Sequence, residues 1–182
     1  MPTRYVAFLR AINVGGHVVK MEVLRTLFET MRLASVKTFI ASGNVIFESS
    51  GKPRSLEQKI EQVLESALGY RVATFLRSIV EVNHTAAQQP FDPSELNGGA
   101  TLFIAFLKIE PSPEAVVRLT ALRNLVDDLR VVGREIYWLR RPNLGETRLS
   151  GAVLEKTLKA EATVRNVTTV QKIANQFLNS SR

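Results

Sequence analysis

The stretch YVAFLR at residues 5–10 matches the stretch FIAFLK at residues 103–108, with the same or a similar residue at each position. Each stretch is apolar at successive positions, so both of its faces would be buried, as is typical of a central strand. A six-residue match between strands is weak evidence by itself, because strands share composition. The same order of predicted elements surrounds both copies, however, and this indicates an internal duplication.

The first half of the chain predicts the order β-α-β-β-α-β. The expected elements are a strand at residues 4–12, a helix at 21–32, strands at 36–40 and 45–48, a helix at 53–68 and a strand at 72–76. Apolar residues spaced three or four apart support both helices. Pro53 at the start of the second helix and Gly69 just after it are typical helix boundaries. The order is that of a ferredoxin-like unit.

The second half repeats this order after a weaker helix at 78–88 and a segment rich in proline and glycine. Its expected elements are a strand at 103–108, a helix at 113–124, a hairpin at 129–139, a helix at 149–159, a short strand at 163–167 and a final helix capped by Thr168. The predicted fold is therefore α+β, with two ferredoxin-like (β-α-β-β-α-β) halves and a C-terminal helix. The predicted division is a first subdomain at 1–88, a linker at 89–100 and a second subdomain with the C-terminal helix at 101–182.

Composition excludes several classes of function. The chain of 182 residues is 45% hydrophobic and 23% charged, which is ordinary for a globular protein. Its apolar runs are far shorter than the roughly 20 residues that a membrane span needs, and no signal peptide is evident, so we expect a cytoplasmic protein without a membrane partner. It contains no cysteine, which fits a reducing compartment. The two histidines, His17 and His84, lie far apart without partners at ligand spacing, so no metal and no cofactor are expected.

Charge is distributed unevenly along the chain. Residues 130–182 hold ten Lys and Arg against four Asp and Glu, and account for most of the net charge of +7. A basic segment of this kind can attract phosphates or nucleic acid. A basic, soluble surface without a specific partner is the plain alternative.

Several strings resemble one known family. They are FLRAINVGG at 8–16, KM at 20–21, LR at 24–25 and IASGNVIF at 40–47. Together they resemble the domain of unknown function family 1697, and the resemblance covers nearly the whole chain. It implies a two-subdomain α+β fold of paired ferredoxin-like units, and it implies no established activity.

The family also carries a C-terminal Thr-x-Arg-Asn signature, which Thr163, Arg165 and Asn166 match. Members of the family often have Trp and then Asn after this signature, where this chain has Val167 and Thr168. If that aromatic residue helps to hold a ligand, this protein would bind the ligand differently or not at all.

Polar residues gather where the predicted topology brings loops together. In the split βαβ order, the first and third strands are antiparallel neighbours, so the end of one meets the start of the other. Glycines before a helix expose backbone N–H groups, which favour anions. The loop between the second helix and the fourth strand, near Tyr70 and Arg71, is expected on the same rim. By the pseudo-repeat, Arg165 and Asn166 would occupy the matching loop of the second half. The candidate ligand-binding residues are Arg10, Asn13, Gly15, Gly16, Lys20, Ser42, Gly43, Asn44, Arg165 and Asn166.

Each candidate also has a plain structural explanation. Gly43 can supply a positive φ in a hairpin turn, and Asn13 and Asn44 can satisfy backbone groups.

In the second half, the pair Asp127-Asp128 is interpreted as a solvated turn and Trp138 as a core residue.

The favoured function is binding of a small anionic or phosphorylated ligand at a polar rim between the subdomains. Nucleic-acid binding through Arg140, Arg141, Arg148 and Arg165 is an alternative, and an uncharacterised enzyme using the same rim is another. No standard nucleotide-binding loop is present. The sequence does not define an oligomeric state.

Overall fold

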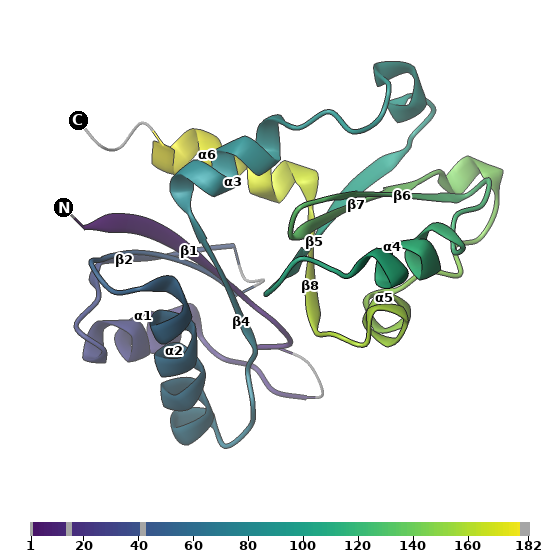
Figure 1. Cartoon of the computed structure of the whole chain (residues 1–182). Coiled ribbons are helices and arrows are strands. Elements are labelled where there is room, and N and C mark those ends of the chain that lie inside the picture. Colours follow the sequence, from purple (N-terminus) through teal and green to yellow (C-terminus); the bar gives the residue numbers. More distant parts are fainter. Residues whose placement is uncertain (1, 14–15, 41–42, 179–182) are drawn as a thin grey trace. The chain divides into compact units, whose positions relative to one another are not determined.

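The computed structural model describes residues 2–13, 16–40 and 43–178 (Figure 1). The strands are β1 (Thr3–Leu9), β2 (Ala34–Phe39), β3 (Asn44–Ser49), β4 (Thr74–Ser78), β5 (Thr101–Leu107), β6 (Asp127–Val132), β7 (Glu135–Arg140) and β8 (Ala162–Asn166). The helices are α1 (Met21–Thr30), α2 (Pro53–Leu68), α3 (Ile79–Ala87), α4 (Pro113–Thr120), α5 (Gly151–Leu158) and α6 (Val167–Leu178), with short 3-10 helices η1 (Pro93–Leu96) and η2 (Pro142–Leu144).

The strands form two four-stranded antiparallel sheets with the same topology. Their orders are β2-β3-β1-β4 and β6-β7-β5-β8. In each sheet the strand predicted to be central has both neighbours: β1 pairs with β3 and β4, and β5 pairs with β7 and β8. The α+β fold and its two similar, ferredoxin-like halves are thus confirmed.

The chain divides into two compact units. Unit 1 comprises Met1–Val82 and Phe177–Arg182, and unit 2 comprises Asn83–Gln176. Helices α3 and α6 each contribute residues to both units.

The core of unit 1 lies between its sheet and two helices. Figure 1 shows α1 and α2 on one face of this sheet. Leu24 and Phe28 of α1 and Ile60 of α2 are fully buried against Ala7 and Phe47 of the sheet. These helix residues recur at the three- and four-residue spacing seen in the sequence, because that spacing places them on one side of the helix. Full burial of one such Phe, Leu or Ile stabilises the fold by about 1.5–3 kcal/mol.

Unit 2 repeats this packing with α4 and α5 on one face of its sheet (Figure 1). Leu119 of α4 and Leu154 of α5 are buried against Ala105 and Trp138. The prediction that Trp138 is a core residue is confirmed, since its side chain is 7% exposed.

Several predicted boundaries are wrong by two to four residues: α4 ends at Thr120 rather than at Asn124, and β4 spans Thr74–Ser78 rather than 72–76. Two other shifts have identifiable reasons. The first strand ends at Leu9 rather than at Ile12, because Ala11 takes a left-handed φ of 58° that strand pairing does not allow. Ile12 is nevertheless buried at 3% exposure, which explains its strand-like appearance in the sequence. The last helix begins at Val167, and its first turn is capped by Asn166, whose Oδ1 accepts from the Thr168 N–H at 2.9 Å, not by Thr168.

Candidate functional site

The loop after β1 and the start of β3 are neighbours in unit 1, as the strand order requires. Phe8 pairs with Asn44, and the Leu9 N–H donates to the Gly43 carbonyl at 2.8 Å. On the other side, the Arg10 N–H donates to the Ala73 carbonyl, also at 2.8 Å. The described candidates here are Arg10, Asn13, Gly16, Lys20, Gly43 and Asn44, which we call the unit 1 loop cluster. Gly15 and Ser42 lie outside the described residues.

The two asparagines of the unit 1 loop cluster hold the loops in shape. Asn13 Oδ1 accepts from the Val19 N–H at 2.8 Å, and Asn44 Nδ2 donates to the Phe39 carbonyl at 3.0 Å. The Asn44 side chain is fully buried. These bonds satisfy backbone groups within the loops, which is the structural role considered for both residues.

Gly43 is required by close packing as well as by its backbone conformation. Its φ is +74°, and a Cβ placed on it would lie 2.6 Å from Ile12 Cγ2. Gly16 also has a positive φ, of +86°, but nothing lies within 4 Å of the position of its Cβ. Gly43 therefore lets the β3 hairpin pack against the loop after β1.

A stacked pair covers the same loop. The rings of His17 and Tyr70 are 4.0 Å apart and nearly parallel, and the Tyr70 hydroxyl donates to the Ile12 carbonyl at 2.8 Å. Burial raises the pKa of Tyr70. The expectation that the segment around Tyr70 reaches this loop is confirmed.

The cationic members of the unit 1 loop cluster are Arg10, which is half-buried, and Lys20, which is exposed. Lys20 occupies the N-cap position of α1 and makes no side-chain cap there. Lys20 therefore adds a positive charge near the end of the helix where anions are favoured.

Arg165 and Asn166 do not lie in a loop, which corrects the expectation from the pseudo-repeat. They are the last two residues of β8, and Arg165 pairs with Ile104 of β5. The Arg165 side chain is 8% exposed, and its Nη1 donates to Thr163 Oγ1 at 2.8 Å and to the Val164 carbonyl at 2.9 Å. Burial lowers the pKa of Arg165 to about 10. The guanidinium group is thus part of the interior of the protein.

Arg77 is the equivalent of Arg165 in unit 1, and sequence reasoning missed it. It pairs with Val6 of β1, the position that matches Ile104 of β5, and it is 1% exposed. Its Nη1 donates to the carbonyl of the preceding residue, Leu76, at 2.9 Å, as that of Arg165 does to Val164. The signal was present in the sequence, since Leu-Arg-Ser and Val-Arg-Asn each end the last strand of a half and precede a helix.

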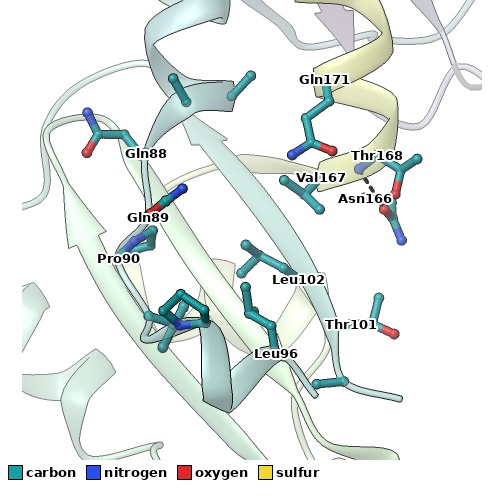
Figure 2. Close-up of a pocket in the computed structure, with 15 residues that line it drawn as sticks. Gln88, Gln89, Pro90, Leu96, Thr101, Leu102, Asn166, Val167, Thr168 and Gln171 are labelled. Carbon is teal, nitrogen blue, oxygen red and sulfur yellow. Dashed lines mark hydrogen bonds between the residues drawn. The ribbon is translucent and has the colours of Figure 1, made fainter. Parts of the chain in front are cut away.

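A cavity of about 540 Å³ lies within unit 2 (Figure 2). The end of α3 and the segment that follows it line one side, the start of β5 lines the floor, and the junction of β8 with α6 lines the other side. Its polar lining residues are Gln88, Gln89, Thr101, Asn166, Thr168 and Gln171. Its apolar lining residues are Ala86, Ala87, Pro90, Phe91, Pro93, Leu96, Ala100, Leu102 and Val167. We call this the unit 2 cavity.

The described lining of the unit 2 cavity carries no charged side chain. In Figure 2 the amides of Gln171 and Gln89 extend toward the space above Leu102, whereas the amide of Gln88 points away from it. The Gln88 amide contacts His84 instead, at 2.8 Å between Gln88 Nε2 and His84 Nε2. Asn166, one of the predicted site residues, also lines this cavity, as do the two family departures Val167 and Thr168.

The apolar floor of the unit 2 cavity reflects a divergence between the two units. Leu102 occupies the β5 position that matches Arg4 of β1, and Leu102 pairs with Leu139 where Arg4 pairs with Glu48. In unit 1 that pair is a salt bridge of 2.7 Å, and Arg4 Nη1 also donates to the Phe177 carbonyl at 2.7 Å. Unit 2 thus has an apolar surface where unit 1 has an ion pair.

Many of the basic side chains of unit 2 are engaged within the unit. Arg141 pairs with Glu95 at 2.9 Å, and Arg130 pairs with Asp128 at 2.7 Å. Arg118 Nε donates to the Thr157 carbonyl at 3.0 Å. Arg148 is exposed. Part of the positive charge of unit 2 is therefore paired within the unit.

Asp127 and Asp128 lie in β6 and are buried, so their interpretation as a solvated turn is wrong. Asp127 is fully buried and accepts hydrogen bonds from Trp138 Nε1 and from the Thr147 hydroxyl, both at 2.8 Å. These bonds tie the segment before α5 to the sheet. The burial of Asp127 and Asp128 was not predicted, because nothing in the sequence pattern indicates which acceptor an indole N–H will bind.

Asp128 titrates below its ordinary range. Burial by itself raises the pKa of Asp128, but the hydrogen bonds from Arg123 and the Leu129 N–H, with the charge of Arg130, outweigh it and lower the pKa from 3.8. A carboxylate whose folded pKa is lowered contributes stability above its unfolded pKa and loses that contribution as pH falls.

We therefore expect the effect of Asp128→Asn on the free energy of unfolding to depend on pH. The variant is expected to be less stable than the wild type at about pH 6, and the difference is expected to shrink as pH falls through and below 3.8. The fluorescence of Trp138, the one tryptophan of the chain, measures unfolding. A difference that stays constant over this range would contradict the pairing of Asp128 with Arg123 and Arg130.

Two four-stranded antiparallel sheets of this order, each covered by helices on one face, define an α+β protein of two ferredoxin-like units. The chain belongs to the family described as protein of unknown function (DUF1697), which matches residues 2–137. A solved structure, that of the conserved bacterial protein SP0830 from Streptococcus pneumoniae, is similar with a TM-score of 0.74 and 22% sequence identity. The similarity covers 98% of this chain and 100% of that chain, and at this identity it concerns the fold. No curated protein matches the chain.

Two further features concern metals and membranes. Over residues 2–13, 16–40 and 43–178, no group of three or more His, Cys, Asp or Glu side chains comes together in a way that could hold a metal ion. None of the helices in the described ranges has the length and apolarity needed to cross a membrane.

Proposed function

We propose that this protein is a small-molecule-binding module whose ligand occupies the unit 2 cavity. The observation that carries this proposal is the combination of a volume of about 540 Å³ with an apolar floor and a few amide and hydroxyl groups around it. Small-molecule sites in proteins are concave, about 300–1,000 Å³ in volume, mostly apolar and equipped with a few polar groups that orient the ligand.

The segment at residues 91–96, which lines part of the cavity, is held in place by contacts that lie outside the cavity. Asp92 caps η1 by accepting from the Ser94 N–H at 2.8 Å, and Glu95 of the same turn accepts from Arg141 at 2.9 Å. The Arg130 guanidinium lies 5.1 Å from the centre of the Phe91 ring. These contacts order residues 91–96 before any ligand arrives, which reduces the entropy that binding has to offset.

The proposal keeps the small ligand expected from the sequence but changes its site and its charge. An anionic or phosphorylated ligand at the unit 1 loop cluster stays a prediction, supported by Arg10 and by Lys20 at the start of α1. Nucleic-acid binding and enzymatic activity stay predictions too. The absence of cysteine from the chain favours a cytoplasmic location, which is part of the proposal.

The test is a screen of small uncharged compounds by thermal shift and NMR, with wild type and Leu102→Arg. Leu102 is half-buried, and arginine is the residue at the matching position of unit 1, so we expect the variant to fold. The arginine side chain would fill the apolar floor and place a charge there, so we expect compounds that bind the wild type to lose at least about tenfold in affinity.

A matched control is Val117→Arg, on the exposed surface of α4, where the side chain is 69% exposed. This variant adds the same charge to unit 2 away from the cavity and should leave binding unchanged. Compounds that bind Leu102→Arg as well as they bind the wild type would contradict the proposal. Inorganic phosphate and single-stranded DNA, added in the same screen, test the two remaining predictions.

A further inference from the structure

If the unit 2 cavity is the ligand site proposed above, its lining also restricts what the ligand can be. A charged group placed in it would leave water for a surface that carries no charged side chain among the described lining residues. Burying an unpaired charge is strongly unfavourable. The part of the ligand that enters the cavity is therefore uncharged.

The distribution of polar groups narrows the class further. Leu96, Leu102 and Val167 offer only apolar contacts, so a sugar, with hydroxyls around its whole ring, would have several of them facing these residues without partners. A plain hydrocarbon would fit the apolar floor but would form no hydrogen bond with the amides of Gln89 and Gln171, both of which are exposed residues of the lining. The lining fits a molecule with apolar faces and a polar edge.

Amide side chains are suited to a particular kind of edge. Each Gln presents a donor and an acceptor side by side in one plane. This pair matches the neighbouring donor and acceptor on the edge of a nucleobase, as in the bidentate contact of Asn or Gln with adenine. Proteins that take up a single base hold its flat faces against aromatic or apolar side chains. In Figure 2 the amides of Gln89 and Gln171 lie on two sides of the space above Leu102.

We propose that the unit 2 cavity binds the uncharged base of a nucleobase or nucleoside, with one face on Leu102 and with polar groups on two sides of the ring bonded to the amides of Gln89 and Gln171. The ribose and any phosphate stay outside the apolar floor. A nucleoside monophosphate therefore binds no more tightly than the matching nucleoside.

The experiment is isothermal titration calorimetry of the full chain with adenine, adenosine, adenosine monophosphate, guanosine, uridine and cytidine. Indole serves as an apolar ring with a single donor, and glucose as a polar ring. The variants are Gln171→Leu, which removes an amide on an exposed position of α6, and Gln62→Leu, which removes an amide on an exposed position of α2 outside the cavity. Gln171→Leu is expected to weaken binding of at least one base about tenfold or more, and Gln62→Leu to change it by less than about twofold.

The outcomes separate the ligand class from the site. Indole or another compound could bind the wild type and not Leu102→Arg, while no base binds. That result overturns the nucleobase assignment and leaves the proposed function in place. Binding of a base that Gln171→Leu does not change also overturns the assignment. Binding that is tighter for the monophosphate than for the nucleoside does the same, because it points to a cationic site. No binding of any compound in this panel or in the wider screen overturns the proposed function itself.

Discussion

Replacing Gly43 by alanine is expected to destabilise unit 1 by about 2–4 kcal/mol. An L residue at a φ of +74° costs about 1–2 kcal/mol relative to glycine. The new Cβ would also lie 2.6 Å from Ile12 Cγ2, and overpacking of this kind typically costs about 1–3 kcal/mol. Ile12 is buried and follows a left-handed residue, so it has little room to move away.

Gly69→Ala is the matched control for this prediction. Gly69 has a φ of +79°, and nothing lies within 4 Å of its Cβ position, so this variant is expected to lose only the backbone part of the effect, about 1–2 kcal/mol. Urea unfolding followed by far-UV circular dichroism measures both. Hydrogen exchange at the Leu9 N–H, which donates to the Gly43 carbonyl, should accelerate in Gly43→Ala. Equal losses in the two variants would show that the packing of Gly43 against Ile12 does not matter.

Asp127→Ala is expected to destabilise unit 2 by about 2–4 kcal/mol. The substitution leaves the buried Trp138 Nε1–H and the Thr147 hydroxyl without their acceptor, and each buried group without a partner costs about 1–3 kcal/mol. Trp138 is the one tryptophan of the chain, so its fluorescence reports both the change at the site and the unfolding of the unit around it.

Two milder variants show whether the carboxylate acts through these bonds. Asp127→Asn keeps one side-chain oxygen as an acceptor and is expected to lose less than Asp127→Ala. Thr147→Val removes the hydroxyl that donates to Asp127 and that accepts from the Leu149 N–H, and is expected to lose about 1–2 kcal/mol. If Asp127→Ala unfolds at the same urea concentration as the wild type, the carboxylate does not hold Trp138 and Thr147 as described.

The order of elements could be predicted because local patterns determined it. Pro53 and Gly69 bound α2 as expected, and Gly69 takes the left-handed conformation that ends the helix. The repeat at residues 5–10 and 103–108 identified both central strands correctly. The errors arose where a buried side chain belongs to an irregular segment, as with Ile12, or where charged residues are buried in a strand, as with Asp127 and Asp128. A hydrophobic pattern does not predict that a charged residue is buried, because its burial depends on hydrogen-bonding and charged partners that are distant in the sequence.

The candidate site could be predicted only in part. Antiparallel pairing of β1 and β3 was enough to bring Gly43 and Asn44 to the loop after β1. The unit 2 cavity could not be foreseen, because the segment containing Gln89 and Leu96 has the composition of a linker and shares no periodicity with α6. Asn166 was identified from the family signature, and its neighbourhood with Leu102 follows from the β5–β8 pairing.

An NMR titration of the labelled full chain with adenosine distinguishes the two candidate sites directly. Backbone amide shifts are expected at Gln89, Thr101, Leu102, Val167 and Gln171, around the unit 2 cavity. Shifts that gather instead at Arg10, Gly16, Lys20 and Gly43 would place the ligand at the unit 1 loop cluster and contradict the assignment of the unit 2 cavity as the ligand site.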